Sequence, residues 1–181
     1  MLQLVVELVP ERWDDEKEEF LEAITTTLQL EHSLISLSKW ESKWCKPFYS
    51  KTAKTYEETI DYIKCMTLTK NVDPTVYDKL SKDNVDAINK YIEAPMTATY
   101  VSEKNGGKSS GEQITSELIY YWMIALNIPF ECQKWHINRL LMLIKVCNVK
   151  NQPPKKMSKK QLMSRNASLN AARKKRLNTK G

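Results

Sequence analysis

The sequence contains little of what enzymes and disulfide-rich proteins depend on. It has two histidines and four glycines in 181 residues, and its four cysteines are scattered without a paired spacing. Histidine is the side chain that most readily exchanges protons near neutral pH, and disulfide frameworks and zinc sites show characteristic cysteine spacings. We therefore expect a non-enzymatic protein with reduced thiols and no cofactor.

Long apolar runs are also missing. No stretch reaches the length of about 18 apolar residues that suggests a membrane-spanning helix. The segment Met1–Glu7 has no basic start, no long apolar stretch and no cleavage site of the kind found in secretory signals. These absences predict an intracellular protein with no membrane partner.

Acidic residues are absent from the end of the chain. After Glu131 there are 14 lysines and arginines and no Asp or Glu, which leaves 14 cations against 22 anions, a net charge of −8, up to that residue. The whole chain nevertheless carries +6. A basic end of this kind can bind nucleic acid, an acidic partner protein or the acidic part of another copy.

The first 30 residues contain patterns of β-strands. Met1–Val9 and Ile24–Leu30 are rich in residues that favour strands, which predicts two strands able to pair antiparallel. The acidic segment between them, Trp13–Leu21, predicts a short helix with its carboxylates in solvent. The side chains expected to face inward from this helix are Trp13, Phe20 and Leu21.

Helix signals dominate the rest of the chain. N-cap residues and apolar periodicity predict a helix over Ser33–Trp44, others beginning at Thr55 and Asp73, and one around Val85–Ile92. The alternating, threonine-rich segment Met96–Val101 predicts a third strand. The glycine-rich segment that follows predicts a surface loop.

The most apolar part of the chain predicts two long helices. Two overlapping capping boxes within Ser109–Gln113 open the first helix. The second is predicted over Phe130–Asn148, and the short connection between them predicts antiparallel packing at the centre of the core. The buried stripe expected on the first helix consists of Ile114, Leu118, Tyr121 and Ala125, widened by Ile119 and Trp122.

These patterns together predict a mainly α fold with a small antiparallel β element, of the α+β class. Residues 1–151 would form a mainly helical body with an N-terminal β-hairpin, and residues 152–181 a basic helical tail after a rigid break at Pro153-Pro154. Ser158 with Gln161 would open the tail helix, which has few apolar residues. The candidate partner-binding residues are the tail cations Lys155, Lys156, Lys159, Lys160, Arg165, Arg173, Lys174, Lys175 and Arg176.

Two local patterns resemble functional sites but lack essential parts. Cys132 and His136 have the spacing of two zinc ligands on a helix, but no third and fourth ligand accompany them. A cysteine–histidine nucleophile at the same positions has no identifiable orienting Asn or Asp. Gly106–Gly111 lacks the Gly-x-x-x-x-Gly-Lys-Ser/Thr spacing of a phosphate-binding loop. We therefore predict no catalytic, metal or cofactor-binding residues.

Four segments carry a resemblance to small proteins encoded by tailed bacteriophages: Ser36–Trp44, Ile114–Trp122, Pro129–His136 and Arg165–Arg173. The resemblance extends over most of the chain, which looks like the tail assembly chaperones of long-tailed phages. It implies a non-enzymatic protein of the host cytoplasm that binds the tape-measure protein while tail-tube subunits polymerise around it.

The residues also allow other partners. A structural virion or packaging component would instead use the basic tail to contact DNA or an acidic capsid or tail surface. The opposite charges of body and tail would also allow copies to associate head to tail. For a chaperone, adaptable contact surface would come from the methionines Met66, Met96, Met123, Met142, Met157 and Met163.

Overall fold

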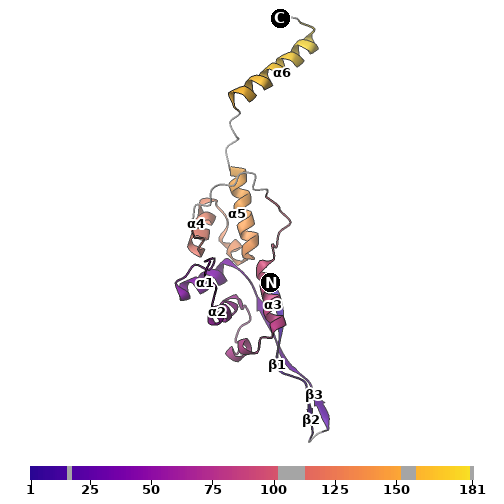
Figure 1. Ribbon diagram of the computed structural model, residues 1–181, viewed down its shortest axis with the longest axis vertical. Coiled ribbons are helices and arrows are strands. Elements are labelled where there is room, and N and C mark those ends of the chain that lie inside the picture. Colours follow the sequence, from indigo (N-terminus) through magenta and orange to yellow (C-terminus); the bar gives the residue numbers. More distant parts are fainter. Residues whose placement is uncertain (16–17, 102–112, 152–157, 180–181) are drawn as a thin grey trace. The chain divides into compact units, whose positions relative to one another are not determined.

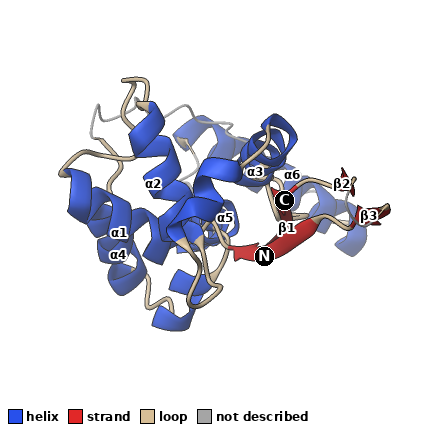
Figure 2. Ribbon diagram, turned by 90° about the horizontal axis from the view of Figure 1, so that it is seen from below, coloured by secondary structure: helices blue, strands red, loops and turns tan. Residues whose placement is uncertain are grey.

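The computed structural model describes residues 1–15, 18–101, 113–151 and 158–179. The chain divides into two compact units, Met1–Val149, which we call the body, and Lys150–Gly181, which we call the tail unit. Helices account for 56% and strands for 15% of the structure, and the strands form small antiparallel two-stranded sheets (Figures 1 and 2). The predicted α+β class, mainly α, is confirmed.

The body begins with an antiparallel ribbon of two strands, β1 (Leu2–Val9) and β4 (Ile24–Leu30), as predicted. Successive side chains of a strand point to opposite faces, so one face of the ribbon can be apolar. Leu4 lies opposite Leu28, and both are buried together with Val6. This face forms one wall of the core.

The segment predicted as a short helix is instead a second hairpin, of β2 (Arg12–Asp14) and β3 (Glu19–Leu21). Trp13 lies directly opposite Phe20, and their ring centroids are 4.9 Å apart. A cross-strand aromatic pair favours this hairpin, whereas a helix would place several like charges within one turn of each other. The expected inward orientation is also wrong, because the two aromatic side chains are 48% and 66% exposed.

Helices follow close to the predicted positions. Ser33 caps the first, and the capping box of Thr55 with Glu58 opens the second. Asp73 opens a 3-10 helix. The elements are α1 (Leu34–Trp44), α2 (Tyr56–Met66), η1 (Pro74–Lys79) and α3 (Lys82–Glu93).

The strand predicted over Met96–Val101 does not form. A third strand would need a free edge of the β1–β4 ribbon. Part of the β4 edge is already bonded, because Leu68 N–H donates to the Gln29 carbonyl at 2.7 Å and Thr67 bridges to Leu30. The alternating pattern of Met96–Val101 could not reveal that Thr67 and Leu68 already bond this edge.

The last helices of the body are α4 (Ser116–Ala125) and α5 (Ile137–Asn151), with the 3-10 helix η2 (Phe130–Lys134) between them. The first begins after Thr115, and Gln113 precedes it without helical structure; the other residues of the predicted capping boxes lie outside the described residues. Within the body, α4 packs mainly against α1.

The single helix predicted over Phe130–Asn148 is interrupted before α5. His136 forms a β-bridge with Ser33, and Ile137 N–H donates to the His32 carbonyl at 2.7 Å. These bonds require extended backbone at the position where the sequence pattern indicated a continuous helix. The end of β4 is thereby joined to the start of α5.

The inward face predicted for the first long helix is only partly correct, because Ile119 is buried as predicted but the main stripe is not. On α4 the buried apolar side chains are Ile119 and Met123, while Tyr121 is 63% exposed. Ile114 and Ala125 are exposed as well. Because this helix is apolar on nearly all sides, periodicity could not indicate which side faces the core. Contact with α1 determines it.

The tail unit is described by itself. Its helix α6 (Lys159–Leu177) begins with the predicted capping box, in which Gln161 N–H donates to Ser158 Oγ and Ser158 N–H to Gln161 Oε1. It ends at Asn178, which takes the left-handed conformation at φ 50°. Asparagine tolerates this conformation better than most residues.

Candidate functional site

The candidate partner-binding cations lie largely on α6. Seven of the nine predicted residues are on this helix, which contains no acidic residue and has no buried side chain. Lys155 and Lys156 lie outside the described residues. The helix therefore presents a strongly positive surface.

Apolar side chains also lie on α6. Leu162 is 47% exposed and Leu169 is 45% exposed, and they are two turns apart on one side of the helix. Near the C-terminal end, a shallow hollow combines apolar and guanidinium groups. Its lining residues are Leu169, Ala172, Arg173, Arg176 and Leu177. A partner for this helix would thus offer both carboxylates and apolar side chains.

A second exposed surface lies on the body and is apolar. Tyr121 and Ile124 are 63% and 60% exposed, and they lie one turn apart on α4. Phe130, at the start of η2, is 51% exposed, and its ring lies 6.4 Å from that of Tyr120. The Tyr120 hydroxyl donates to Gln133 Oε1 at 2.9 Å, which links the helix to η2. We call the residues Tyr120, Tyr121, Ile124 and Phe130 the α4 surface.

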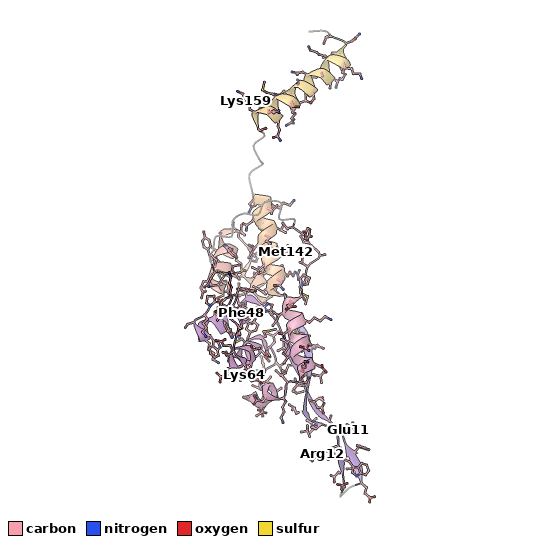
Figure 3. The ribbon with its side chains drawn as sticks, in the orientation of Figure 1. Glu11, Arg12, Phe48, Lys64, Met142 and Lys159 are labelled. Carbon is pink, nitrogen blue, oxygen red and sulfur yellow. The ribbon has the colours of Figure 1, made fainter. Side chains whose placement is uncertain are left out.

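The methionines divide between core and surface. Met66 and Met123 are fully buried. Met96 and Met163 are 41% and 64% exposed. Met142 lies partly exposed on α5 (Figure 3), and Met157 lies outside the described residues. Some of the methionines are therefore exposed, and others belong to the core.

The two histidines lie together inside the body. His32 is 1% exposed, and its ring centroid is 5.0 Å from that of His136. His32 Nδ1 and the Tyr62 hydroxyl form a hydrogen bond. His136 Nε2 donates to the Tyr91 carbonyl at 3.0 Å, while its Nδ1 accepts from the Asn138 N–H. This pattern identifies the neutral Nε2–H tautomer of His136.

Burial keeps both rings neutral. The pKa of His32 is lowered to about 3, mainly by burial and additionally by the neighbouring His136. Burial also lowers the pKa of His136, against the opposing effect of its bond to the Tyr91 carbonyl. A charged ring in this position would lose its hydration, and the attraction between Glu31 and a charged His136 does not compensate for that loss. The contacts of the pair join β4, α2, α3 and α5, so the histidines connect elements of the core.

The zinc-like pair does not gain further ligands. Cys132 is buried on η2, and His136 is engaged by the contacts just described. In the part of the chain that the structure describes, no group of three or more His, Cys, Asp or Glu side chains is placed to hold a metal ion. The four cysteines are free thiols. The glycine-rich segment Gly106–Gly111 lies outside the described residues.

Two buried carboxylates, Glu41 and Glu58, link parts of the body, and the sequence analysis did not single out Glu41. Glu41 accepts from the N–H groups of Phe48 and Ser116, both at 2.7 Å. Glu58 accepts from Lys46 Nζ at 2.6 Å. This bond, with that from the Thr55 N–H, lowers the pKa of Glu58. The capping box identified Glu58 as an N3 residue, but nothing local indicated the role of Glu41.

None of the helices among residues 1–15, 18–101, 113–151 and 158–179 is long and apolar enough to cross a membrane. Comparison of the chain with protein-family models, with curated proteins and with solved structures found no match. The functional candidates are therefore the two exposed surfaces, the basic one on α6 and the apolar one on α4.

Proposed function

We propose that the protein is a tail assembly chaperone of a long-tailed bacteriophage. It acts without catalysis in the host cytoplasm and binds the tape-measure protein during tail morphogenesis. The observation that supports this role is the α4 surface, where aromatic and aliphatic side chains are exposed on a helix whose other side is buried. Exposed apolar clusters on folded domains are typical of protein-binding sites.

The chemistry of the α4 surface suits a helical client. Tyr121 and Ile124 are one turn apart, and Phe130 extends the apolar area beyond the end of the helix. An amphipathic client helix could place its apolar side chains, spaced three and four residues apart, along this row. The tape-measure protein would be such a client, and a tail-tube protein is a second one to test.

The basic tail unit would strengthen this contact electrostatically. The seven cations of α6 attract an acidic client over longer distances than apolar contacts do. Charge attraction is screened as the Debye length falls from about 10 Å at 0.1 M salt to about 3 Å at 1 M. Apolar contacts are not weakened in this way. The two contributions can therefore be separated by salt.

The test is a pull-down with the tape-measure protein and, separately, with the tail-tube protein. Tyr121→Ser with Ile124→Ser should weaken retention of the client about tenfold or more, because the affected side chains would lose apolar burial. The matched control is Tyr56→Ser with Leu68→Ser, which changes two exposed apolar residues outside the α4 surface. Equal retention by both double variants would contradict the proposal.

The salt dependence tests the role of the tail unit. Deleting residues 152–181 should weaken client binding at 0.1 M salt and have little effect at 1 M. If the deletion abolishes binding at both salt concentrations, the client contacts the tail unit directly rather than the α4 surface.

A second function is favoured by one observation, the seven cations of α6 without a single acid. In a structural virion or packaging component, this helix would contact DNA phosphates or an acidic capsid or tail surface. Fluorescence anisotropy with duplex DNA at several salt concentrations tests it. DNA binding with a steep salt slope that vanishes on deletion of residues 152–181, together with no retained tail protein, would replace the first proposal by the second. Mass spectrometry should then also find the protein in mature particles.

A further inference from the structure

The hairpin of β2 and β3 is a part of the body whose exposed side chains have no assigned role. We call residues 10–15 and 18–23 the arm. The arm continues the ribbon away from the helices of the body (Figure 1), and Glu11 and Arg12 lie on it, away from the core residue Phe48 (Figure 3). The principal contacts of β2 and β3 are with each other.

The arm exposes two large aromatic side chains. Trp13 and Phe20 form an edge-to-face pair and are 48% and 66% exposed. Neither belongs to the core of the body. Two strands of three residues are marginal by themselves, and an aromatic pair of this size would gain considerable free energy from further burial. The pair is therefore a suitable anchor for a partner.

The arm is also strongly acidic. Its described residues include six carboxylates and one cation, Arg12. The carboxylates are Glu11, Asp14, Asp15, Glu18, Glu19 and Glu22. A partner should therefore be basic around an apolar centre, since like charges brought together across an interface are unfavourable.

The C-terminal half of α6 has this chemistry. Its hollow places Arg173 and Arg176 beside Leu169, Ala172 and Leu177. Guanidinium groups bind carboxylates through paired hydrogen bonds and also stack on the faces of aromatic rings. The hollow thus complements an aromatic pair flanked by carboxylates in both charge and polarity.

We propose that the arm of one copy binds α6 of a second copy. The Trp13–Phe20 pair occupies the hollow, and the carboxylates of the arm face the cations Arg173, Lys174 and Arg176. Every copy has one arm and one α6, so the contact is heterologous, and repetition produces chains of copies rather than closed dimers unless the rotation closes a ring. The inference does not depend on the client proposed above.

Charge reversal in trans tests this contact with the purified full-length protein and no client. The arm variant combines Glu11→Lys, Glu19→Lys and Glu22→Lys, three exposed residues. The tail variant combines Arg173→Glu, Lys174→Glu and Arg176→Glu, the three cations of the proposed contact. Sedimentation equilibrium at 0.1 M salt should show that each variant alone associates about tenfold or more weakly than the unchanged protein, because like charges would face each other.

An equimolar mixture of the two variants should restore association. The basic arm of the arm variant then meets the acidic α6 of the tail variant. The unchanged acidic arm of the tail variant likewise meets the unchanged basic α6 of the arm variant. The control variant combines Asp78→Lys, Asp86→Lys and Glu93→Lys, which reverses three exposed charges outside the arm and should associate like the unchanged protein. Trp13→Ser with Phe20→Ser should also weaken association, by removing the apolar anchor.

Several outcomes would overturn the proposal. These are no self-association of the unchanged protein, equal weakening by the control variant, or a mixture that does not associate. A contact that is independent of protein concentration, detected as quenching of Trp13 fluorescence by a label on α6, would place the partner within the same chain. Thermal unfolding followed by circular dichroism verifies that the arm and tail variants are folded.

Discussion

The buried histidine pair makes the stability of the body depend on pH. Below pH 6.5, the ordinary pKa of histidine, the unfolded chain takes up a proton on His32, but the folded protein does not until about pH 3. The unfolded state therefore binds more protons throughout this window, and the free energy of unfolding rises with pH. His136, whose pKa is also lowered, adds to the same trend.

The corresponding measurement is urea unfolding of the body between pH 7.5 and 5. We expect the free energy of unfolding to fall below pH 6.5, with a slope of up to about 1.4 kcal/mol per pH unit for each buried histidine. His32→Phe preserves a ring but cannot titrate, so this variant should show a flatter slope even though losing the bond to Tyr62 lowers its stability at pH 7.5. An unchanged slope would mean that His32 is protonated in the folded protein.

The tryptophans of α1 and α4 contribute unequally to stability. Trp40 is 1% exposed, and its Nε1–H donates to the Glu58 carbonyl at 2.8 Å. Trp122 packs against the core but is only partly buried. Trp40→Ala should therefore cost about 3–5 kcal/mol of unfolding free energy, and Trp122→Ala less than half as much. Urea unfolding at pH 7.5 compares them, and equal losses would place Trp122 in the core.

At the scale of elements, Glu41 couples the start of α4 to α1. Its carboxylate accepts from Ser116 N–H at the first turn of α4 and from Phe48 N–H after α1. A glutamine side chain has one acceptor oxygen, so in Glu41→Gln one of these N–H groups would face an NH₂ donor. We expect a loss of about 1–3 kcal/mol in the free energy of unfolding, the cost of an unsatisfied buried group.

Glu57→Gln is the matched control for this substitution, because Glu57 is exposed on α2. It should change the free energy of unfolding by less than about 0.5 kcal/mol. If Glu41→Gln behaves like the control, the amide has found other partners, and Glu41 does not fix the position of α4.

Elements with local signals could be predicted from the sequence. The capping boxes at Thr55 and Ser158 gave correct helix starts, since a cap depends on residues three positions apart. The strands β1 and β4 were predicted from their residue types. The α+β class followed from these elements together.

Elements that depend on distant contacts could not be predicted in the same way. The β2–β3 hairpin exists because Trp13 meets Phe20 across the strands, while its acidic composition suggested a solvated helix. The exposed side of α4 depends on contact with α1, which periodicity does not report. Tyr121, which belongs to the exposed α4 surface, was therefore predicted to be buried, although the basic character of α6 was clear from composition.

For the molecule as a whole, the division into two units predicts that the tail unit is dispensable for folding. No side chain of α6 is buried, and α5 ends at Asn151. A chain ending at Asn151 retains 22 acids and 18 lysines and arginines, a net charge of −4, and all core residues of the body. It should unfold cooperatively at nearly the same temperature as the full chain.

Differential scanning calorimetry of the truncated and full-length chains checks this expectation. In far-UV circular dichroism, the truncated chain should lack only the helical signal of the residues of α6. An insoluble fragment, or one that unfolds without a cooperative transition, would show that the tail unit contributes to the core after all.

The bridge between Ser33 and His136 has a kinetic consequence. It joins the end of β4 to the start of α5, two segments separated by most of the body's sequence. A large loop must close before this contact can form, and closing it lowers the conformational entropy of the chain. The formation of local helices does not compensate for this cost. The body should therefore fold more slowly than a helical bundle of the same length, and its central contacts can form only after α5 has been synthesised.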